Sequence, residues 1–364
     1  MNNPFNPSFG KVPNIFLDRA HAVTKLSTEL QNPNSPYQTT LIYGVRGVGK
    51  TSLLTDVGNK MSAKKNWLVV NLTTNYNVLQ TLIDSICQKS SPEIKRSLDK
   101  IEGIKLSAFG IQFEYHPQEL TETNYQILLE NILDKLQAKN ISLLVTIDEV
   151  DPTPEVKNFI SLYQLLIREN YRISLIMTGL PNKLSELQND DVLTFLLRSA
   201  RMELSNLDLL SIKHSYQDTF AKKGITISDD VLIAMVKKTK GYAYSFQLLG
   251  YLLWEIADKK ITLATLEQIQ GEYLATLGRN VYYKVLQELS PVDHSFVIAM
   301  AKAPTQVVTT AYLQQKLDKP KNYLSMYRKR LLDAQVIKSP ARGMLEFTLP
   351  YFKEYILENL KFYV

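Results

Sequence analysis

The sequence predicts an α/β fold: a doubly wound parallel sheet in the first 204 residues, followed by an all-α unit and a third unit that ends in a β-hairpin. Three observations predict it. Continuous apolar runs alternate with amphipathic stretches up to about Leu204, helical spacing then replaces them, and near residue 340 a turn joins two short apolar runs. With 364 residues, the chain is long enough for two or three domains that each bury a core.

Four runs have the apolar composition of parallel strands that are covered on both faces. They are residues 39–43, 67–73, 141–148 and 173–179. The stretches between them have the amphipathic spacing of helices, at 77–88, 124–138 and 155–170. Residues 104–117 alternate like a β-hairpin, which predicts an insertion at the edge of this unit.

The loop GVRGVGKT, residues 44–51, lies between the first of these strands and a helical stretch. Its glycines allow backbone conformations closed to other residues, so several N–H groups can point at phosphate oxygens. We expect Lys50 to reach the β and γ phosphates and the Thr51 hydroxyl to bind Mg²⁺. This order is that of P-loop NTPases and predicts ATP and Mg²⁺ as cofactors. The residues expected to hold the nucleotide are Gly44, Val45, Arg46, Gly47, Val48, Gly49, Lys50, Thr51 and Ser52.

An acidic pair ends the third apolar run, in LLVTIDEVD, residues 143–151. A carboxylate at the end of a strand beside a phosphate loop is placed to bind the metal, and a second one to orient and deprotonate an attacking water. We therefore expect Asp148 at the metal and Glu149 as the base of an ATPase. Acidic pairs after strands can also be solvated loop starts.

The fourth apolar run ends in Thr178, followed by Gly179, Leu180 and Pro181. A hydroxyl at this point can hold the lytic water or contact the γ-phosphate, which would make the strand end a sensor of hydrolysis. The alternative is a turn that ends the strand and leaves the threonine exposed.

After Leu204 four stretches carry helical spacing, at 207–224, 228–241, 242–259 and 262–277, which predicts an all-α lid. In the third unit Ser290, Pro291 and Asp293 form a strong helix start. Three helical stretches follow, and residues 336–350 form two short strands about a turn; three helices and a hairpin predict a winged helix. The expected units are an ATPase core at 1–204, the lid at 205–282 and the winged-helix domain at 283–364.

The net charge of +6 is concentrated in the third unit, because residues 281–364 hold 12 Lys or Arg and 7 Asp or Glu. A helix-turn-helix places its later helix in the DNA major groove while flanking cations meet phosphates. The alternative is that the unit binds a protein and that its basic residues form a solvated face. The expected DNA contacts are Lys319, Lys321, Tyr327, Arg328, Arg330 and Arg342.

Together, the opening NPFNPSFGKVPNIFLDR, the phosphate loop, IDEVD, MTGLP and TKGYAYSFQLLGYLLWEIA resemble bacterial ATP-binding proteins of the AAA+ superfamily, closest to the origin-recognition-like branch. The resemblance implies that Phe16 to Arg19 border the adenine pocket and that Gly241, Tyr242 and the residues up to Tyr244 begin a lid helix facing the nucleotide. Asp18 stands where such relatives usually have glycine, and Ala243 where proline is common. The turn at Gly241 lacks the arginine that many AAA+ lids direct at the γ-phosphate.

The resemblance also draws attention to Arg198 and Arg201, because an arginine near this region of AAA+ assemblies completes the active site of a neighbouring subunit. The alternative is a helix-surface arginine paired with an acidic neighbour. If an arginine acts in this way, activity depends on a homo-oligomer formed on ATP binding.

The sequence shows no secretory leader and no apolar run long enough to span a bilayer, so we expect a cytoplasmic protein without a membrane partner. The single cysteine and the four histidines suggest no chemistry. Two functional hypotheses remain. One is a DNA-binding AAA+ ATPase whose nucleotide state controls assembly, and the other is a signal-type, STAND-like ATPase switch whose winged helix binds a protein partner.

Overall fold

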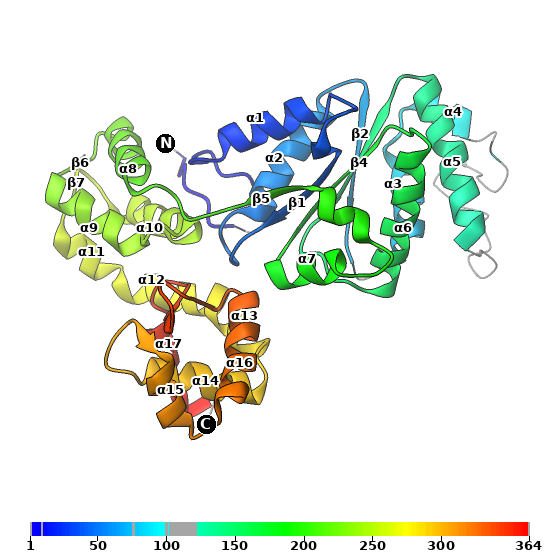
Figure 1. The fold of residues 1–364 in the computed structure, drawn as a ribbon. Helices are drawn as coiled ribbons and strands as arrows, with labels where there is room; N and C mark the ends of the chain where they lie inside the picture. The colour runs from blue at the N-terminus through cyan, green and yellow to red at the C-terminus, as the bar shows by residue number, and fades with distance from the viewer. Residues whose placement is uncertain (1, 9, 75–76, 99–100, 102–121, 363–364) are drawn as a thin grey trace.

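The computed structural model describes residues 2–8, 10–74, 77–98, 101 and 122–362. The hairpin predicted at 104–117 lies outside the described residues. Figure 1 shows the α/β part at the right, the helical part at the left and the C-terminal part below the junction between them.

The α/β part contains a five-stranded sheet of order β2-β3-β4-β1-β5, in which every described pair is parallel. Four of the strands lie at the predicted runs, which confirms the predicted fold class. The fifth, β5, was not predicted. The strands are β1 (Thr39–Tyr43), β2 (Trp67–Leu72), β3 (Ser142–Ile147), β4 (Ile173–Gly179) and β5 (Ala200–Glu203).

Helices cover both faces of this sheet, because successive strand residues point to opposite sides. Leu143 and Val145 pack with α3, α5 and α6, whereas Leu144 packs with α1 and α2. The helices are α1 (Ala20–Glu29), α2 (Lys50–Ser62), α3 (Val78–Lys89), α4 (Pro92–Leu98), α5 (Glu122–Ala138), α6 (Pro154–Arg168) and α7 (Pro181–Gln188), with 3-10 turns η1 (Pro36–Gln38) and η2 (Thr194–Arg198).

The parallel register brings the carboxyl ends of the central strands to one edge of the sheet. Tyr43 lies opposite Gly179, and Ile147 lies opposite Met177. The residues that follow β1 and β3, together with Thr178 near the end of β4, therefore meet at the same place. This edge is where ligands of open α/β sheets bind.

The helical part follows the prediction with two differences. The short strands β6 (Thr226–Ile227) and β7 (Lys260–Ile261) pair here, so strands do not end at Leu204. The helix predicted over residues 262–277 is divided at Ile269. The helices are α8 (Leu209–Lys222), α9 (Asp229–Thr239), α10 (Ala243–Ile256), α11 (Leu263–Gln268) and α12 (Gln270–Leu277).

A π-helical turn, η3 (Gly278–Tyr282), and α13 (Tyr283–Gln287) lead into the C-terminal part. Ser290 and Asp293 form the predicted capping box at its first long helix. The hairpin is present, and an unpredicted third strand makes an antiparallel sheet of order β8-β10-β9. The elements are α14 (Pro291–Ala301), β8 (Val308–Thr309), α15 (Thr310–Leu317), α16 (Lys321–Asp333), β9 (Ile337–Lys338), β10 (Met344–Phe347), α17 (Phe352–Glu358) and η4 (Leu360–Phe362).

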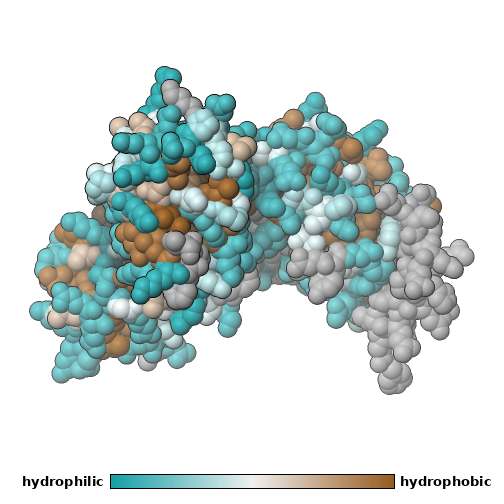
Figure 2. All heavy atoms as spheres, turned by 90° about the horizontal axis from the view of Figure 1, so that it is seen from below, coloured by the Kyte–Doolittle hydropathy of each residue, from teal (hydrophilic) through white to brown (hydrophobic). Residues whose placement is uncertain are grey.

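The helical and C-terminal parts share one buried hydrophobic cluster, which runs from Phe5 near the N-terminus to Ile356 on α17. The α/β part has its own clusters on the two faces of its sheet. Seen from below, the surface is hollowed between the C-terminal part and the α/β part (Figure 2). No helix in the described part of the chain is long and apolar enough to cross a bilayer.

Candidate nucleotide site

The loop after β1 has the backbone that its glycines allow. Gly47 has φ +75° and Gly49 has φ +103°, both in the region that favours glycine. A Cβ on Gly47 would lie 1.9 Å from the hydroxyl oxygen of Tyr242. The second glycine of the loop is therefore required both by the turn and by the close approach of a side chain from the helical part.

Lys50 begins α2 and is buried. Its ammonium group donates to the carbonyl oxygens of Gly44, at 2.8 Å, and Val45, at 3.1 Å. Burial lowers the pKa of Lys50 to about 8, although the carboxylates of Glu149 and Asp148 act in the opposite direction. The loop thus holds a cation whose charge is only partly compensated by the protein.

The carboxylate of Asp148 links the segment that follows β1 to the end of β4. The Thr51 hydroxyl donates to one of its carboxylate oxygens at 2.7 Å, and the Thr178 hydroxyl donates to the other. The backbone N–H of Glu149 donates in turn to the Thr178 hydroxyl at 3.2 Å. Thr178 is fully buried, so the alternative of an exposed threonine at the end of the strand is wrong.

Glu149 has φ +47°, a left-handed conformation that is uncommon for a residue with a side chain. Its side chain is half exposed, and one of its carboxylate oxygens lies 3.6 Å from a guanidinium nitrogen of Arg46. The acidic motif therefore presents two different carboxylates. Asp148 is fixed by two hydroxyls, whereas Glu149 reaches into open space beside the loop.

The start of α10 contacts the phosphate loop directly. The Tyr242 hydroxyl donates to the carbonyl of Arg46 at 2.7 Å, and the backbone N–H of Tyr244 donates to the carbonyl of Gly47 at 3.2 Å. Gly241, with φ +75°, makes the turn before them but does not line the cavity at the loop. Of the residues that the resemblance assigned to this region, Tyr244 therefore lines the cavity, whereas Gly241 forms the turn before the helix.

The segment before α1 holds the loop from the other side. A guanidinium nitrogen of Arg19 donates to the carbonyls of Ser205, at 2.6 Å, and Val48, at 3.3 Å. Asp18 has φ +56° and accepts a hydrogen bond from the backbone of Asp208. Asp18, which stands where the relatives it resembles usually have glycine, therefore has the left-handed backbone conformation that glycine adopts most easily.

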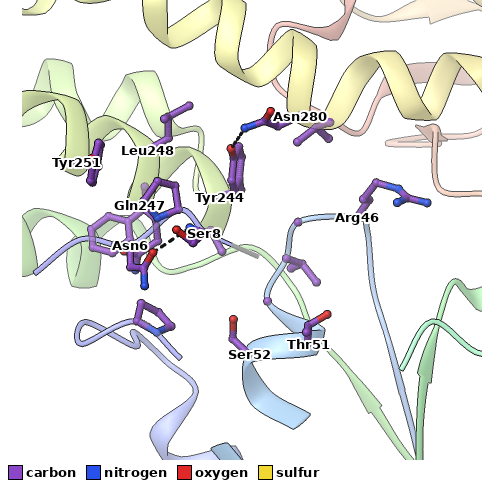
Figure 3. A pocket seen from close by; sticks show the side chains of 18 of the residues that line it. Asn6, Ser8, Arg46, Thr51, Ser52, Tyr244, Gln247, Leu248, Tyr251 and Asn280 are labelled. Atoms are coloured by element: carbon purple, nitrogen blue, oxygen red, sulfur yellow. Dashed lines mark hydrogen bonds between the residues drawn. The ribbon is translucent and has the colours of Figure 1, made fainter. Parts of the chain in front are cut away.

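A cavity of about 760 Å³ lies between the N-terminal segment, the phosphate loop and the helical part (Figure 3). Its volume is within the range of small-molecule sites. Thr51 and Ser52 lie at the start of α2, and Tyr244, which accepts a hydrogen bond from Asn280, lies across from them. The cavity thus lies over the loop expected to hold phosphates, with apolar and polar side chains beyond it.

A second cavity of about 700 Å³ lies on the other side of the loop. Lys50, Asp148 and Glu149 line it, as do Val336 and Leu349 of the C-terminal part. The acidic motif therefore faces a space that the C-terminal part helps to close.

Arg198 and Arg201 do not line either cavity at the phosphate loop. Arg198 ends η2 and lines a separate cavity of about 900 Å³, which Thr39 at the start of β1 also lines. Arg201 lies on the edge strand β5, opposite Leu41, and is exposed. Arg201 therefore does not lie on a helix, whereas Arg198 is exposed at the end of a short 3-10 helix.

The six residues expected to contact DNA differ in their exposure and in the hydrogen bonds that they make. Lys319 and Arg342 are exposed. Arg330 donates to the buried carboxylate of Asp293 at 2.7 Å. Tyr327 is half-buried against the ring of Tyr323, with centroids 4.4 Å apart. Arg328 is half-buried with a hydrogen bond to Ser339, and the side chain of Lys321 lies outside the described residues.

Arg330 lies on the exposed face of α16 together with residues that were not among the expected DNA contacts. Asn322, Ser325, Met326 and Lys329 are exposed and follow helical spacing, whereas Leu324 and Leu331 are buried. The seven-residue spacing of those two leucines marks the inward face, and this signal was available in the sequence. Lys329 is the missed residue of greatest interest for a polyanion.

Within the described residues, no group of three or more His, Cys, Asp or Glu side chains could hold a metal ion. Any metal at the loop would therefore depend on Thr51, Asp148 and oxygens from a ligand.

In a comparison with known proteins, two family models each match part of the chain. Residues 17–151 match the bacterial DnaA ATPase domain, and residues 279–356 match a domain of unknown function, DUF8462. Chromosomal replication initiator protein DnaA of Treponema denticola is 24% identical over 244 residues, which are 60% of this chain and 50% of that protein. DnaA of Borreliella afzelii is 29% identical over 129 residues, 35% of this chain and 25% of that protein. The chain thus matches a quarter to a half of the length of these relatives.

Two solved structures share the fold over nearly the whole chain. The ORC2 protein of Aeropyrum pernix, in ADPNP and ADP complexes, has a TM-score of 0.68 at 14% identity, with 98% of this chain and 97% of that chain covered. The Walker-type ATPase PABY2304 of Pyrococcus abyssi has a TM-score of 0.62 at 18% identity, with 94% and 96% covered. The chain has the fold of these two proteins, and residues 17–151 match the bacterial DnaA ATPase domain. The predicted resemblance to the origin-recognition-like branch of the AAA+ superfamily is thereby confirmed.

Proposed function

We propose that this protein binds ATP with Mg²⁺ and hydrolyses it slowly, and that the nucleotide acts on the conformation of the protein. The observation that carries the proposal is the convergence of the phosphate loop, Asp148 and Glu149 at one sheet edge, between two cavities. The similar ORC2 structure is that of complexes with ADPNP and ADP. The loop would contribute Gly44 to Ser52, with Arg19 and Tyr242 holding its backbone.

The residues present fit a magnesium ion. Thr51 and Asp148 are hydrogen-bonded to each other at 2.7 Å, and a hydroxyl and a carboxylate are oxygen ligands of the kind that Mg²⁺ takes alongside phosphates. When bound, the ion would neutralise charge on the phosphates. Thr178 would hold Asp148 in place through its own hydroxyl.

Glu149 is the residue we assign to water activation. Its carboxylate is half exposed and opens on both cavities, so a water molecule can reach it. The buried Thr178 hydroxyl accepts from the Glu149 backbone and so links the base to the end of β4. A positioned carboxylate of this kind contributes roughly 10²- to 10⁴-fold to a rate by proton transfer.

We propose further that the C-terminal part is a winged helix that binds duplex DNA, and that the division at 1–204, 205–282 and 283–364 separates core, lid and winged helix. Support comes from the order of three helices and a hairpin and from the exposed cations Lys319, Lys329 and Arg342. The structure makes Arg330 a poor candidate because Asp293 already holds it. Arg198 and Arg201 remain candidates to act on a neighbouring subunit in an ATP-dependent homo-oligomer.

One observation favours the second candidate, an ATPase switch whose C-terminal part binds a protein. In the single chain, Val336 and Leu349 of that part already line the cavity beside Glu149. A C-terminal part held against the site is what a switch between a closed monomer and an open form requires.

Nucleotide binding is tested with calorimetric titration of ATP and ADP into the wild type and into Lys50→Ala. We expect binding to the wild type and none to the variant, because the variant lacks the buried cation of the loop. Lys65→Ala, an exposed lysine after α2, serves as the matched control. Equal binding by Lys50→Ala and wild type would show that the loop does not hold the phosphates.

Partner choice is tested separately. Salt-dependent DNA binding with and without ATP should show affinity that falls as salt rises, because neutralised phosphates release counterions. Failure to bind any DNA at low salt would exclude the DNA proposal. Mass measurement then separates the two candidates: an oligomer that forms only with ATP supports the first, and a persistent monomer with ADP supports the second.

A further inference from the structure

Arg46 of the phosphate loop lines both the nucleotide cavity and the second cavity. Figure 3 shows its side chain directed to the side of the loop opposite Asn6, Ser8 and Tyr244. One guanidinium nitrogen lies 2.9 and 3.2 Å from the two carboxylate oxygens of Glu288, and the other lies 3.6 Å from Glu149. One arginine of the loop therefore links the expected base to a residue 242 positions away.

Glu288 lies directly after α13, at the junction with the C-terminal part. It lines the second cavity together with Gln335 and Leu349. The C-terminal part shares its buried cluster with the helical part. It faces the α/β part across this cavity and is linked to it by the ion pair. Breaking the pair would therefore loosen the junction with the α/β part and leave the link to the helical part intact.

The surroundings of Arg46 allow a phosphate group to compete with Glu288 for its guanidinium group. Arg46 is largely buried, with its side chain 20% exposed, whereas Glu288 is 48% exposed. Guanidinium groups bind phosphate oxygens at least as well as carboxylates, through the same forked geometry. A triphosphate brings one more phosphate group to the loop than a diphosphate does, on the side where Lys50 and Glu149 lie.

We propose that Arg46 is a latch that holds the C-terminal part against the site through Glu288, and that the γ-phosphate of ATP releases it. This inference rests on the proposed function. ADP leaves the Arg46–Glu288 pair in place, and ATP draws Arg46 from Glu288 and frees the C-terminal part to bind its partner. An arginine of the phosphate loop itself thus distinguishes ATP from ADP.

The test measures the separation of the two parts by energy transfer between labels at Lys65→Cys and Gln315→Cys, both exposed, with the buried Cys87 left in place. In the wild type we expect the distance to increase with a non-hydrolysable ATP analogue and not with ADP. Glu288→Gln should show the increased distance without nucleotide. Glu358→Gln, an exposed carboxylate on α17, should behave as the wild type.

Binding supplies a second readout, because release and ATP binding are reciprocally linked. Glu288→Gln should bind the ATP analogue roughly 1.5- to 5-fold more tightly than the wild type, the range typical of a partly exposed ion pair, with ADP affinity unchanged. If both proteins bind nucleotide but show the same distances and affinities, the latch is wrong and the proposed function stands. If the wild type binds no ATP, both are wrong.

Discussion

The charge on Lys50 is the residue-scale feature most sensitive to pH. Burial lowers its pKa to about 8, so the folded protein loses this proton near pH 8. Nucleotide phosphates favour the protonated form, and binding above pH 8 must take up a proton. ATP affinity should therefore fall as pH rises from 7 to 9, by about tenfold per unit once the pKa is passed. Titrations in buffers of different ionisation enthalpy measure both the affinity and the proton uptake.

The control for this pH dependence is Lys50→Arg, which keeps a cation that does not titrate in this range. Its affinity, although lower throughout, should be flat between pH 7 and 9. A wild-type affinity equally flat over that range would show that Lys50 stays protonated and that its burial is relieved in solution.

Glu149→Gln separates binding from turnover at a second residue. The amide keeps the size of the side chain but cannot accept a proton from water. We expect ATP binding within about threefold of the wild type and a hydrolysis rate lower by roughly 10²-fold or more. Phosphate release at saturating ATP measures the rate. Retained hydrolysis would assign the base to another residue, and Asp151→Asn, in the same motif but paired with Lys183, is the matched control.

At the scale of elements, α16 carries two neighbouring exposed cations for which we expect opposite results, because Arg330 is paired with Asp293. Lys329→Ala removes an exposed cation, so DNA affinity and its salt dependence should fall while stability changes by less than about 0.5 kcal/mol. Arg330→Ala leaves the buried Asp293 without its cation, and the half-exposed pair suggests a loss of about 1–2 kcal/mol of stability. Denaturant unfolding and DNA titration on both variants measure the two effects. The reverse pattern would contradict this assignment of the two residues.

Helix α16 also shows what could not be predicted from the sequence. Strands β1 to β4, the phosphate loop and the helix start at Ser290 were predicted because their signals are local. The ion pair of Arg330 depends on Asp293, 37 residues earlier, and no local pattern contains that partner. A cluster of basic residues identifies a charged helix but does not tell which of its cations is held by an acidic partner.

Strand β5 was missed for a related reason. It has four residues, ARME, which alternate between partly exposed and exposed because it lies at the edge of the sheet. Such a strand lacks the continuous apolar run by which buried parallel strands are found. Its place beside β1 follows only from the tertiary structure, and Arg201 was accordingly considered as part of a helix.

At the scale of the whole molecule, the N-terminal segment fastens the helical part. Phe5 is buried among Tyr216, Phe220, Phe246 and Trp254, and a Cβ on Gly250 would lie 2.4 Å from its ring. Phe5→Ala should cost about 3–5 kcal/mol of stability, as expected for a large buried ring. Thermal and denaturant unfolding measure it. Asn6, Pro7 and Ser8, which follow Phe5, line the nucleotide cavity, so ATP affinity should fall as well.

Asn3→Ala is the control in the same segment, because its side chain is half-buried and makes hydrogen bonds to Tyr251 and Glu255 of α10 and to the backbone of Phe5, but packs in no aromatic cluster. It should cost about 1 kcal/mol, less than Phe5→Ala. Gly250→Ala alone should destabilise by overlap with Phe5, and in the Phe5→Ala background that penalty should disappear, since the two positions share one contact. Additive losses would show that Phe5 does not occupy this site in solution.

The backbone of Glu149 has a consequence for anyone who selects stabilised variants of this protein. A left-handed conformation costs a residue with a side chain roughly 1 kcal/mol relative to glycine, and asparagine tolerates it better than glutamate. A screen for heat resistance should therefore enrich Glu149→Gly and Glu149→Asn. Both would remove the carboxylate proposed to activate water, so the most heat-resistant survivors at this position would be those that bind ATP and keep it.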